Sequence, residues 1–314
     1  MSGELLWWLN LLISVGIFTL LAVSLNLING YAGMFHLGHH GFWAMGAYAA
    51  AWFTIAMYDS SAGSQPHIYI ASILFAGLVA AIGGLLVGIP CLRLRGDYLA
   101  IATLGFGEIV RIAIQNSPPE VLGGSLGIEI PRVLMKVSRK TMVDFRLLTL
   151  SIIVGACVLA IWGVRNYIRS AQGRRLLAVA QDETAAGLLG INPTHSKVSA
   201  FVIGAFLAGV AGGFFAHYEG TITPLDFTFM EMVKIFLIIV LGGMGSLSGC
   251  VIGGLLVIGT ERMLVRGPAF VESWWQVEFP LILALMIIFR PQGIFGRREI
   301  SDVWCALRAK WSRS

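Results

Sequence analysis

Three histidines are the residues of this chain whose types and spacing most invite a chemical interpretation. His36, His39 and His40 fall within one short stretch, and histidines are frequent ligands of zinc and of haem iron. No Cys, Asp or Glu stands near them in the sequence to complete a metal site, and no second well-placed histidine offers a haem partner. We therefore expect no metal and no cofactor, and interpret the three histidines as polar packing within a loop.

The glycine-rich segment LGGMGSLSG, residues 241–249, could belong to a nucleotide site. Ser248, however, stands where the third glycine of a dinucleotide fingerprint is required. No GxxxxGK[ST] or HExxH motif occurs in the chain. The four cysteines, Cys91, Cys157, Cys250 and Cys305, have no metal-ligand or redox spacing. The sequence thus predicts a non-catalytic protein that draws energy from an ion gradient or from partner subunits.

The composition excludes a soluble protein. Hydrophobic residues make up 57% of the chain, charged residues 12%, and the mean hydropathy is +0.80, whereas soluble domains carry about a quarter charged residues. Long apolar runs without strand-like alternation leave membrane-spanning helices as the one option. We expect an all-α, polytopic transmembrane helical bundle of about 8–10 spans, with broken or re-entrant segments. We expect one transmembrane domain, residues 1–296, followed by a tail, residues 297–314.

The charge distribution predicts how the chain is oriented. The predicted spans are Leu5–Ile28, Gly41–Tyr58, Ile68–Ile89, Tyr98–Ile114, Leu147–Arg165, Ser196–Ala216, Met230–Leu241, Ser248–Leu264 and Trp275–Phe289. The loops Arg93–Arg95 and Arg165–Lys197 and the C-terminal stretch Arg290–Arg313 fall on one side and hold thirteen Lys or Arg residues, against about seven on the other. The positive-inside rule places the C-terminus in the cytoplasm and the N-terminus outside. The net charge of +5 thus reflects membrane orientation and not nucleic-acid binding.

The tail itself alternates Trp304, Leu307 and Trp311 with basic residues. This pattern is typical of an amphipathic helix on the membrane lipid surface, and a frayed terminus is the alternative.

Two polar, glycine-rich segments interrupt the apolar pattern, Asn29–Phe42 and Leu241–Gly254. Irregular backbone at membrane depth is tolerated only inside protein or beside a water-filled cavity, and paired interruptions point to a transporter's substrate path. Tight turns at the membrane surface are the alternative. The candidate pathway residues are Asn29, Gly30, Gly33, Glu108, Gly242, Gly243 and Gly245.

Charged residues within spans need a partner. Glu108 and Arg111 are three residues apart on one helix face, which predicts an ion pair, a pathway lining or a subunit contact. Glu231 and Lys234 have the same spacing near a span end, where Lys234 is expected to snorkel and anchor the helix. Pairs of glycines four apart, as at Gly84/Gly88, Gly209/Gly213 and Gly249/Gly253, predict close helix packing.

The charged segment Ser170–Lys197 keeps a helical pattern between two spans. Ser170 and Asp182 are suited to cap two short helices, and Gly190 to end the second. Leu176, Val179 and Ala180 form an apolar stripe with no core of their own. The stripe must lie on the bundle, on lipid headgroups or in a partner's groove, and we interpret the segment as a docking element.

Part of this segment, GRRLLAVAQDETAAGLLGIN, resembles the cytoplasmic coupling ("EAA") loop of ABC-importer permeases. Glu183, Ala185, Ala186 and Gly190 occupy the matching places. The stretches Ser24–Ala51, Gly96–Arg111, Val240–Gly249 and Phe289–Gly296 are similar, in the same order, to the branched-chain amino-acid ABC-transporter permease family, specifically its LivM type. The chain departs from that pattern at Phe35–His39, where the family commonly has a small or polar residue and then Ser-Leu-Gly-His.

The resemblance implies a bacterial inner-membrane importer that moves branched-chain or related amino acids by alternating access. Its implied partners are a second homologous permease, two cytoplasmic ATP-binding subunits and a periplasmic substrate-binding protein. ATP binding would move the Ser170–Lys197 segment and rock the bundle outward, and hydrolysis would reset it. Arg174, Glu183 and the turn Ala185–Gly190 are the implied ATPase contact.

Other readings predict different behaviour. A permease of the same kind could carry another small polar solute, such as urea, an amide or an aromatic acid. An ion-coupled secondary transporter or channel would work without ATPases, and a membrane redox subunit would absorb visible light.

Overall fold

The structure, a computed structural model, describes residues 2–58, 65–91, 94, 96–131 and 142–266, together with residues 281, 284–285, 288–289, 293–294 and 296. The α-helices are α1 (Ser2–Asn26), α2 (His39–Met57), α3 (Pro66–Cys91), α4 (Asp97–Gln115), α5 (Pro119–Leu122), α6 (Met142–Arg169), α7 (Ala171–Gln181), α8 (Glu183–Leu188), α9 (Pro193–Glu219), α10 (Phe229–Gly242) and α11 (Leu247–Val265). The π-helical turn η1 (Leu27–Tyr31) extends α1, and η2 (Gly124–Leu126) and η3 (Pro224–Phe227) are 3₁₀ turns.

The described helices confirm the all-α, polytopic membrane bundle. Five are long and apolar enough to cross a membrane: Gly3–Tyr31, Pro66–Cys91, Val143–Arg169, Pro193–Glu219 and Leu247–Leu264. Three further predicted spans coincide with α2, α4 and α10, which do not reach that combination of length and apolarity. The α10 helix has 14 residues, about 21 Å at 1.5 Å per residue, and cannot cross the ~30 Å hydrocarbon core. It is therefore a half-span.

The ninth predicted span, Trp275–Phe289, and the tail from residue 297 lie outside the continuously described residues. Most of the basic Arg132–Arg146 loop does so as well.

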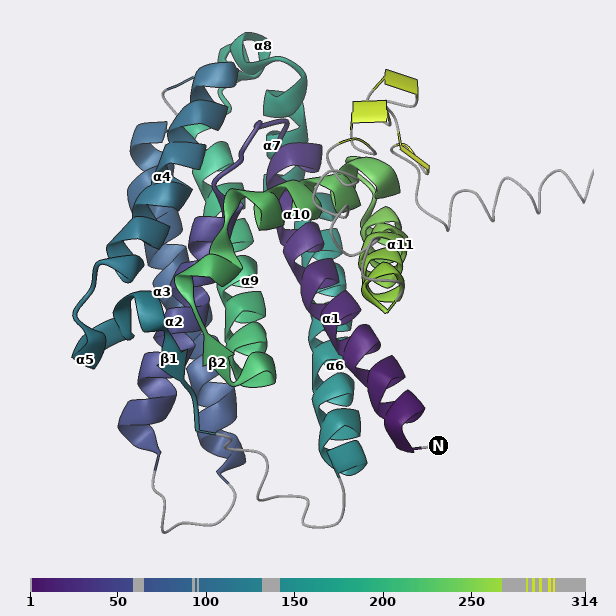
Figure 1. Cartoon of the computed structure of the whole chain (residues 1–314). Coiled ribbons are helices and arrows are strands. Elements are labelled where there is room, and N and C mark those ends of the chain that lie inside the picture. Colours follow the sequence, from purple (N-terminus) through teal and green to yellow (C-terminus); the bar gives the residue numbers. More distant parts are fainter. Residues whose placement is uncertain are drawn as a thin grey trace, which may run out of the picture.

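The centre of the bundle is a close group of α2, α3 and α9, with α1 packed beside α9 (Figure 1). Small residues allow this closeness: Gly212 of α9 sits against the backbone of Trp43 in α2, and Gly213 against Ile73 in α3. The predicted glycine packing positions are confirmed, because a side chain added at Gly84, Gly209 or Gly253 would run into a neighbouring helix. On the other side of α1 lie α6, α10 and α11.

Two short strands tie the loop after α5 to the loop after α9. They are β1 (Ile128–Glu129) and β2 (Thr221–Ile222), which pair antiparallel with Ile128 opposite Ile222. This pair lies toward the lower end of the bundle in Figure 1, whereas α7 and α8 cover the upper end and the N-terminus of α1 lies at the bottom. The charged Ser170–Lys197 segment and the N-terminus thus occupy opposite ends, as the predicted span order requires.

Candidate functional site

The first interruption of the apolar pattern is shorter than predicted. After α1 the chain continues through η1, where wide-turn hydrogen bonds run from Ala32 N to Leu27 O (3.1 Å) and from Met34 N to Ile28 O (3.1 Å). Asn29 and Gly30, predicted to be non-helical, therefore belong to a helix, because a π-helical turn absorbs the extra residue without leaving backbone groups unpaired. The non-helical stretch before α2 is residues 32–38, the first break.

The side chain of Asn29 forms two hydrogen bonds across the first break. Its side-chain amide donates to the His36 carbonyl (3.2 Å), and its Oδ1 accepts from the His36 amide (3.3 Å). The Leu37 amide donates to Thr103 Oγ1 of α4 (3.1 Å). Ala32, Met34, His36 and Gly38 of the break are buried, whereas Gly33 and Phe35 are exposed. The hydrogen bonds from Asn29 and Thr103 pair the backbone of His36 and the Leu37 amide within the protein, as irregular backbone at membrane depth requires.

The second interruption is also short. The α10 helix ends at Gly242 and α11 begins at Leu247, which leaves residues 243–246 as the second break. Gly243 and Gly245 have φ values of +109° and +90°, which other residues rarely adopt. Ser246 caps α11 by accepting a hydrogen bond from Gly249 N (3.1 Å).

Asn26, the last residue of α1, joins the end of that helix to the second break. Its Nδ2 donates to the Ser246 carbonyl (3.0 Å), and its Oδ1 accepts from the Gly245 amide (2.8 Å). A side chain on the adjacent Gly30 would collide with the Gly245 backbone. The sequence interpretation missed Asn26, although an asparagine within a span is itself a signal, because such a residue needs a polar partner.

The three histidines pack inside the protein, but the predicted loop holds only His36, because His39 and His40 form the start of α2. His39 Nε2 lies 2.7 Å from Ser24 Oγ, and the His36 ring stacks on Phe42 and meets Phe201 edge-on. All three rings are buried. Within the part of the chain that the structure describes, no group of three His, Cys, Asp or Glu residues is arranged to hold a metal ion.

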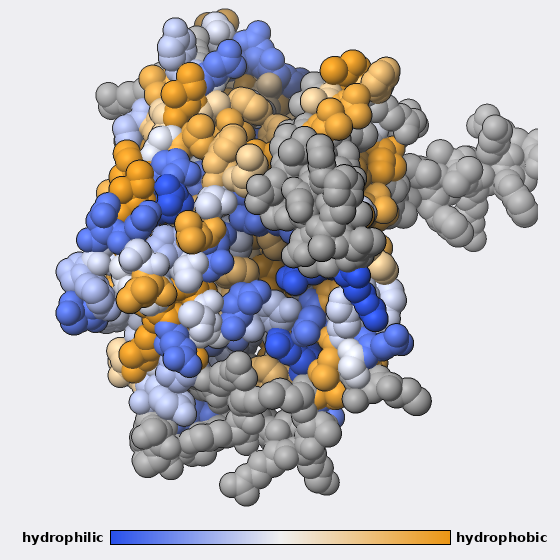
Figure 2. All heavy atoms as spheres, viewed as in Figure 1, coloured by the Kyte–Doolittle hydropathy of each residue, from blue (hydrophilic) through white to orange (hydrophobic). Residues whose placement is uncertain are grey.

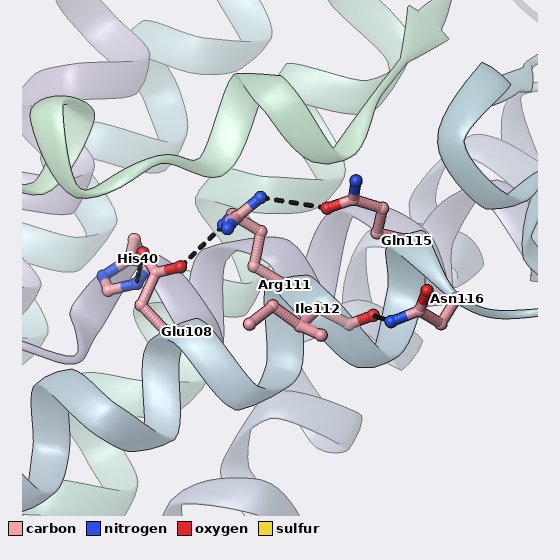
Figure 3. A network of polar contacts seen from close by, with 6 residues as sticks. All are labelled: His40, Glu108, Arg111, Ile112, Gln115 and Asn116. Atoms are coloured by element: carbon pink, nitrogen blue, oxygen red, sulfur yellow. Dashed lines mark hydrogen bonds and ion pairs between the residues drawn. The ribbon is translucent and has the colours of Figure 1, made fainter.

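A charged network runs along α4 from His40 (Figure 3). Glu108 lies between His40, 3.7 Å from its Nε2, and Arg111, whose Nε donates to Glu108 Oε2 at 2.7 Å. Arg111 also reaches Gln115 Oε1 at 3.2 Å. The predicted Glu108–Arg111 ion pair is confirmed. Both side chains keep partial exposure, 31% for Glu108 and 20% for Arg111, so the network borders an open face of α4.

Glu231 and Lys234 differ from the sequence interpretation. Lys234 does not snorkel: its side chain is 5% exposed, and its Nζ donates to Glu231 (2.9 Å) and to Glu261 of α11 (2.8 Å). Burying an ammonium group is tolerated because two carboxylates compensate its charge. The sequence could not indicate Glu261, which lies 27 residues away. The triad joins the half-span α10 to α11.

The charged segment folds into α7 and α8 with the predicted caps. Ser170 Oγ accepts from Gly173 N (3.2 Å), and Asp182 Oδ1 accepts from Thr184 N (2.8 Å). Gly190, at φ +78°, follows α8. Leu176 and Val179 are buried on the bundle, whereas Ala180 is exposed. Of the three environments expected for the apolar stripe, the bundle surface is the one observed.

The predicted contact residues differ in how open they are. Arg174 and Ala185 are exposed, and Arg174 donates to the Arg169 carbonyl (2.8 Å). Ala186 is buried, and the Glu183 carboxylate pairs with Lys197 at the start of α9 (2.6 Å). Leu188 and Leu189, which lie within the predicted contact turn Ala185–Gly190, are 86% and 80% exposed. The tip of this segment therefore presents apolar side chains beyond the end of the bundle.

Comparison with known proteins decides the family. The chain matches the family described as "Branched-chain amino acid transport system / permease component" over residues 8–289, which is most of its length. It belongs to that permease family. The permease is 36% identical to the high-affinity branched-chain amino acid transport system permease protein LivM of Salmonella typhimurium, over 88% of this chain and 67% of that relative.

Other relatives of the permease are more distant. The LivH permease protein of Escherichia coli is 27% identical over 91% of this chain and 93% of its own. The probable LivM permease protein of Methanocaldococcus jannaschii is 25% identical over 95% and 94%. The higher identity to Salmonella LivM than to LivH supports the predicted LivM type. The permease is thus a multi-pass membrane component of a transport system.

Proposed function

We propose that the permease is one pore-forming subunit of an ATP-driven importer for branched-chain amino acids in a bacterial inner membrane. The observation that carries this proposal is the similarity to LivM over 88% of the chain, since that relative is named for branched-chain amino acid transport. In this proposal two cytoplasmic partner subunits hydrolyse ATP, and a second permease completes the pore. A periplasmic binding protein delivers the substrate.

The ATPase contact is assigned to the segment α7–α8. Its exposed residues Arg174, Ala185, Gly190, Leu188 and Leu189 project from one end of the bundle. An apolar tip flanked by charge suits a groove in a soluble partner, because buried apolar side chains supply most of the affinity at such contacts. Glu183 and Ala186 set the orientation of α8, through Lys197 and through burial on the bundle. This end then faces the cytoplasm, together with the C-terminal tail.

Reconstitution tests the proposal. Proteoliposomes that contain the permease, its partner permease and the ATPases are expected to accumulate labelled leucine, isoleucine or valine only with ATP and the binding protein. Proteoliposomes with the purified permease alone serve as control and are expected to take up nothing. Uptake by that control would favour an ion-coupled transporter. Accumulation of urea, an amide or an aromatic acid in place of branched-chain amino acids would support the ATP-driven importer but assign it a different substrate.

The substrate path is assigned to the region of the two breaks and the α4 network, which are linked through Thr103 and Asn26. Figure 2 shows that hydrophilic residues gather over the middle of the viewed face, between hydrophobic areas. A face in contact with lipid would be apolar at that depth, because polar and charged residues within a membrane face protein or water. The partner permease would cover this region, and Gly30, Gly33 and Glu108 are open enough to line the path directly. Asn29, Gly242, Gly243 and Gly245 are buried within the chain, so they would shape the path from behind.

Glu108→Gln is expected to lower ATP-driven uptake several-fold while the amount of assembled complex stays unchanged. The side chain is 31% exposed, so loss of its pair with Arg111 costs the fold no more than about 1 kcal/mol. Initial uptake rates and co-purification of the ATPases measure the two effects. Glu120→Gln, an exposed change in α5, is the matched control and should leave uptake intact. Wild-type uptake by Glu108→Gln would show that Glu108 does not belong to the substrate path.

A further inference from the structure

The end of α7 lies directly on the first break. Gly33, with φ at +65°, faces Ala180, and a methyl group added to Gly33 would come within 3.6 Å of the Ala180 side chain. The α7 helix also packs on η1, and its Leu176 and Val179 are buried on the bundle. Close-packed interiors transmit displacement because they have little free volume. A movement of α7 therefore acts on η1 and the first break.

The side chain of Asn26 links η1 to the second break and to α11, near the other end of the chain. It directly precedes η1 and is fully buried. Its Nδ2 donates to the Ser246 carbonyl and, at 3.2 Å, to Cys250 Sγ in the first turn of α11. The Gly245 amide, which no helix pairs, donates to Asn26 Oδ1. Three hydrogen bonds from one side chain thus hold the second break to the end of α1.

These bonds are directional, whereas the surrounding contacts are apolar. A buried amide that loses its partners costs about 1–3 kcal/mol per group, so the Asn26 bonds add a restraint on position to the close packing around them. The second break must therefore follow η1 when η1 moves. The second break joins α10 to α11 and so sets their relative position. Gly242 of α10 and Gly249 of α11 meet there backbone to backbone.

We propose that Asn26 is a positioning residue of the transport cycle: it transmits the movement of α7 from the first break to the second. The proposal rests on the importer function and on α7–α8 as its ATPase contact. It assigns Asn26 a task distinct from substrate contact and from ATPase docking. Loss of Asn26 should therefore separate ATP hydrolysis from uptake.

The test uses the reconstituted complex with Asn26→Leu, which keeps the branched shape and the number of heavy atoms of the side chain and removes all three hydrogen bonds. We expect the ATPases to stay bound, ATP hydrolysis to continue, and the amount of substrate moved per ATP to fall by about tenfold, a usual size for coupling between sites. Cys250→Ser, which retains an acceptor for Asn26 Nδ2, should stay near wild type.

Two further variants make the outcome decisive. Gly30→Ala places a methyl group against Asn26 Oδ1 and the Gly245 amide and should reproduce the uncoupling with Asn26 present. Asn10→Leu is the matched control, because Asn10 lies in the same helix and its Oδ1 has no hydrogen-bond partner among the described residues. It should transport as the wild type does.

An unchanged ratio of uptake to hydrolysis in Asn26→Leu would overturn the proposal, as would an equal loss in Asn10→Leu. If the complex with Asn26→Leu does not assemble, the ratio of uptake to ATP hydrolysis in Gly30→Ala tests the proposal in its place. Failure of both to assemble would make Asn26 a packing residue and also overturn the proposal. A wild-type complex that moves substrate without ATP would refute the importer function itself, and is recognised without any variant.

Discussion

Gly46→Leu is expected to leave almost no correctly folded permease in the membrane. The α2 and α9 helices approach so closely at this point that even a Cβ atom on Gly46 would overlap the backbone of Gly209. Overpacking a core costs about 1–3 kcal/mol when side chains can adjust, and backbone atoms cannot. Membrane helices associate through such close packing, since lipid gives them no hydrophobic incentive to do so. Membrane abundance and monodispersity in detergent measure the loss.

Gly163→Leu is the matched control for this change. Gly163 lies within α6, and a Cβ atom there meets nothing within 4 Å. The same substitution should therefore leave abundance within a factor of about two, because it exposes leucine to lipid at a small cost. Equal loss in both variants would mean that helix propensity or insertion, rather than the α2–α9 contact, governs assembly.

The glycines also indicate what the sequence could predict about the fold. The predicted packing positions at Gly84, Gly209 and Gly253 lie at helix contacts, because glycine spacing is a local pattern. Gly46 is the partner of Gly209 across 163 positions of sequence, and nothing local points to it. Eight of the nine predicted spans lie on described helices for the same reason: apolar length is local. The shortness of α10 is local as well, because the predicted span Met230–Leu241 already held only twelve residues.

In the candidate site, too, contacts between residues close in the sequence could be predicted and contacts between distant residues could not. Caps at Ser170 and Asp182 and the Glu108–Arg111 pair join residues two to four positions apart, and the sequence predicted each. Asn26 with Gly245, and Lys234 with Glu261, join helices far apart in the sequence. A chain read alone shows that a buried polar group needs a partner, but not which residue the fold supplies.

Glu183→Lys is expected to abolish substrate-stimulated ATP hydrolysis while the permease stays inserted. Glu183 lies in the first turn of α8, where a negative charge suits the helix dipole, and its carboxylate holds Lys197 at 2.6 Å. A lysine would oppose both Lys197 and the dipole, and would reverse the charge that α8 presents to the ATPase. Stimulation of hydrolysis by the loaded binding protein is the measurement, with membrane abundance as the check on insertion.

The charge-swapped double variant, Glu183→Lys with Lys197→Glu, separates the two roles of Glu183. It restores an ion pair between α8 and α9 but leaves the reversed charge at position 183. Because 34% of the Glu183 side chain is exposed, we expect its charge to matter to the ATPase, so stimulated hydrolysis should stay well below wild type. Full recovery would instead show that Glu183 acts only through Lys197, by holding α8 in place. The exposed Leu188 and Leu189 would then carry the contact.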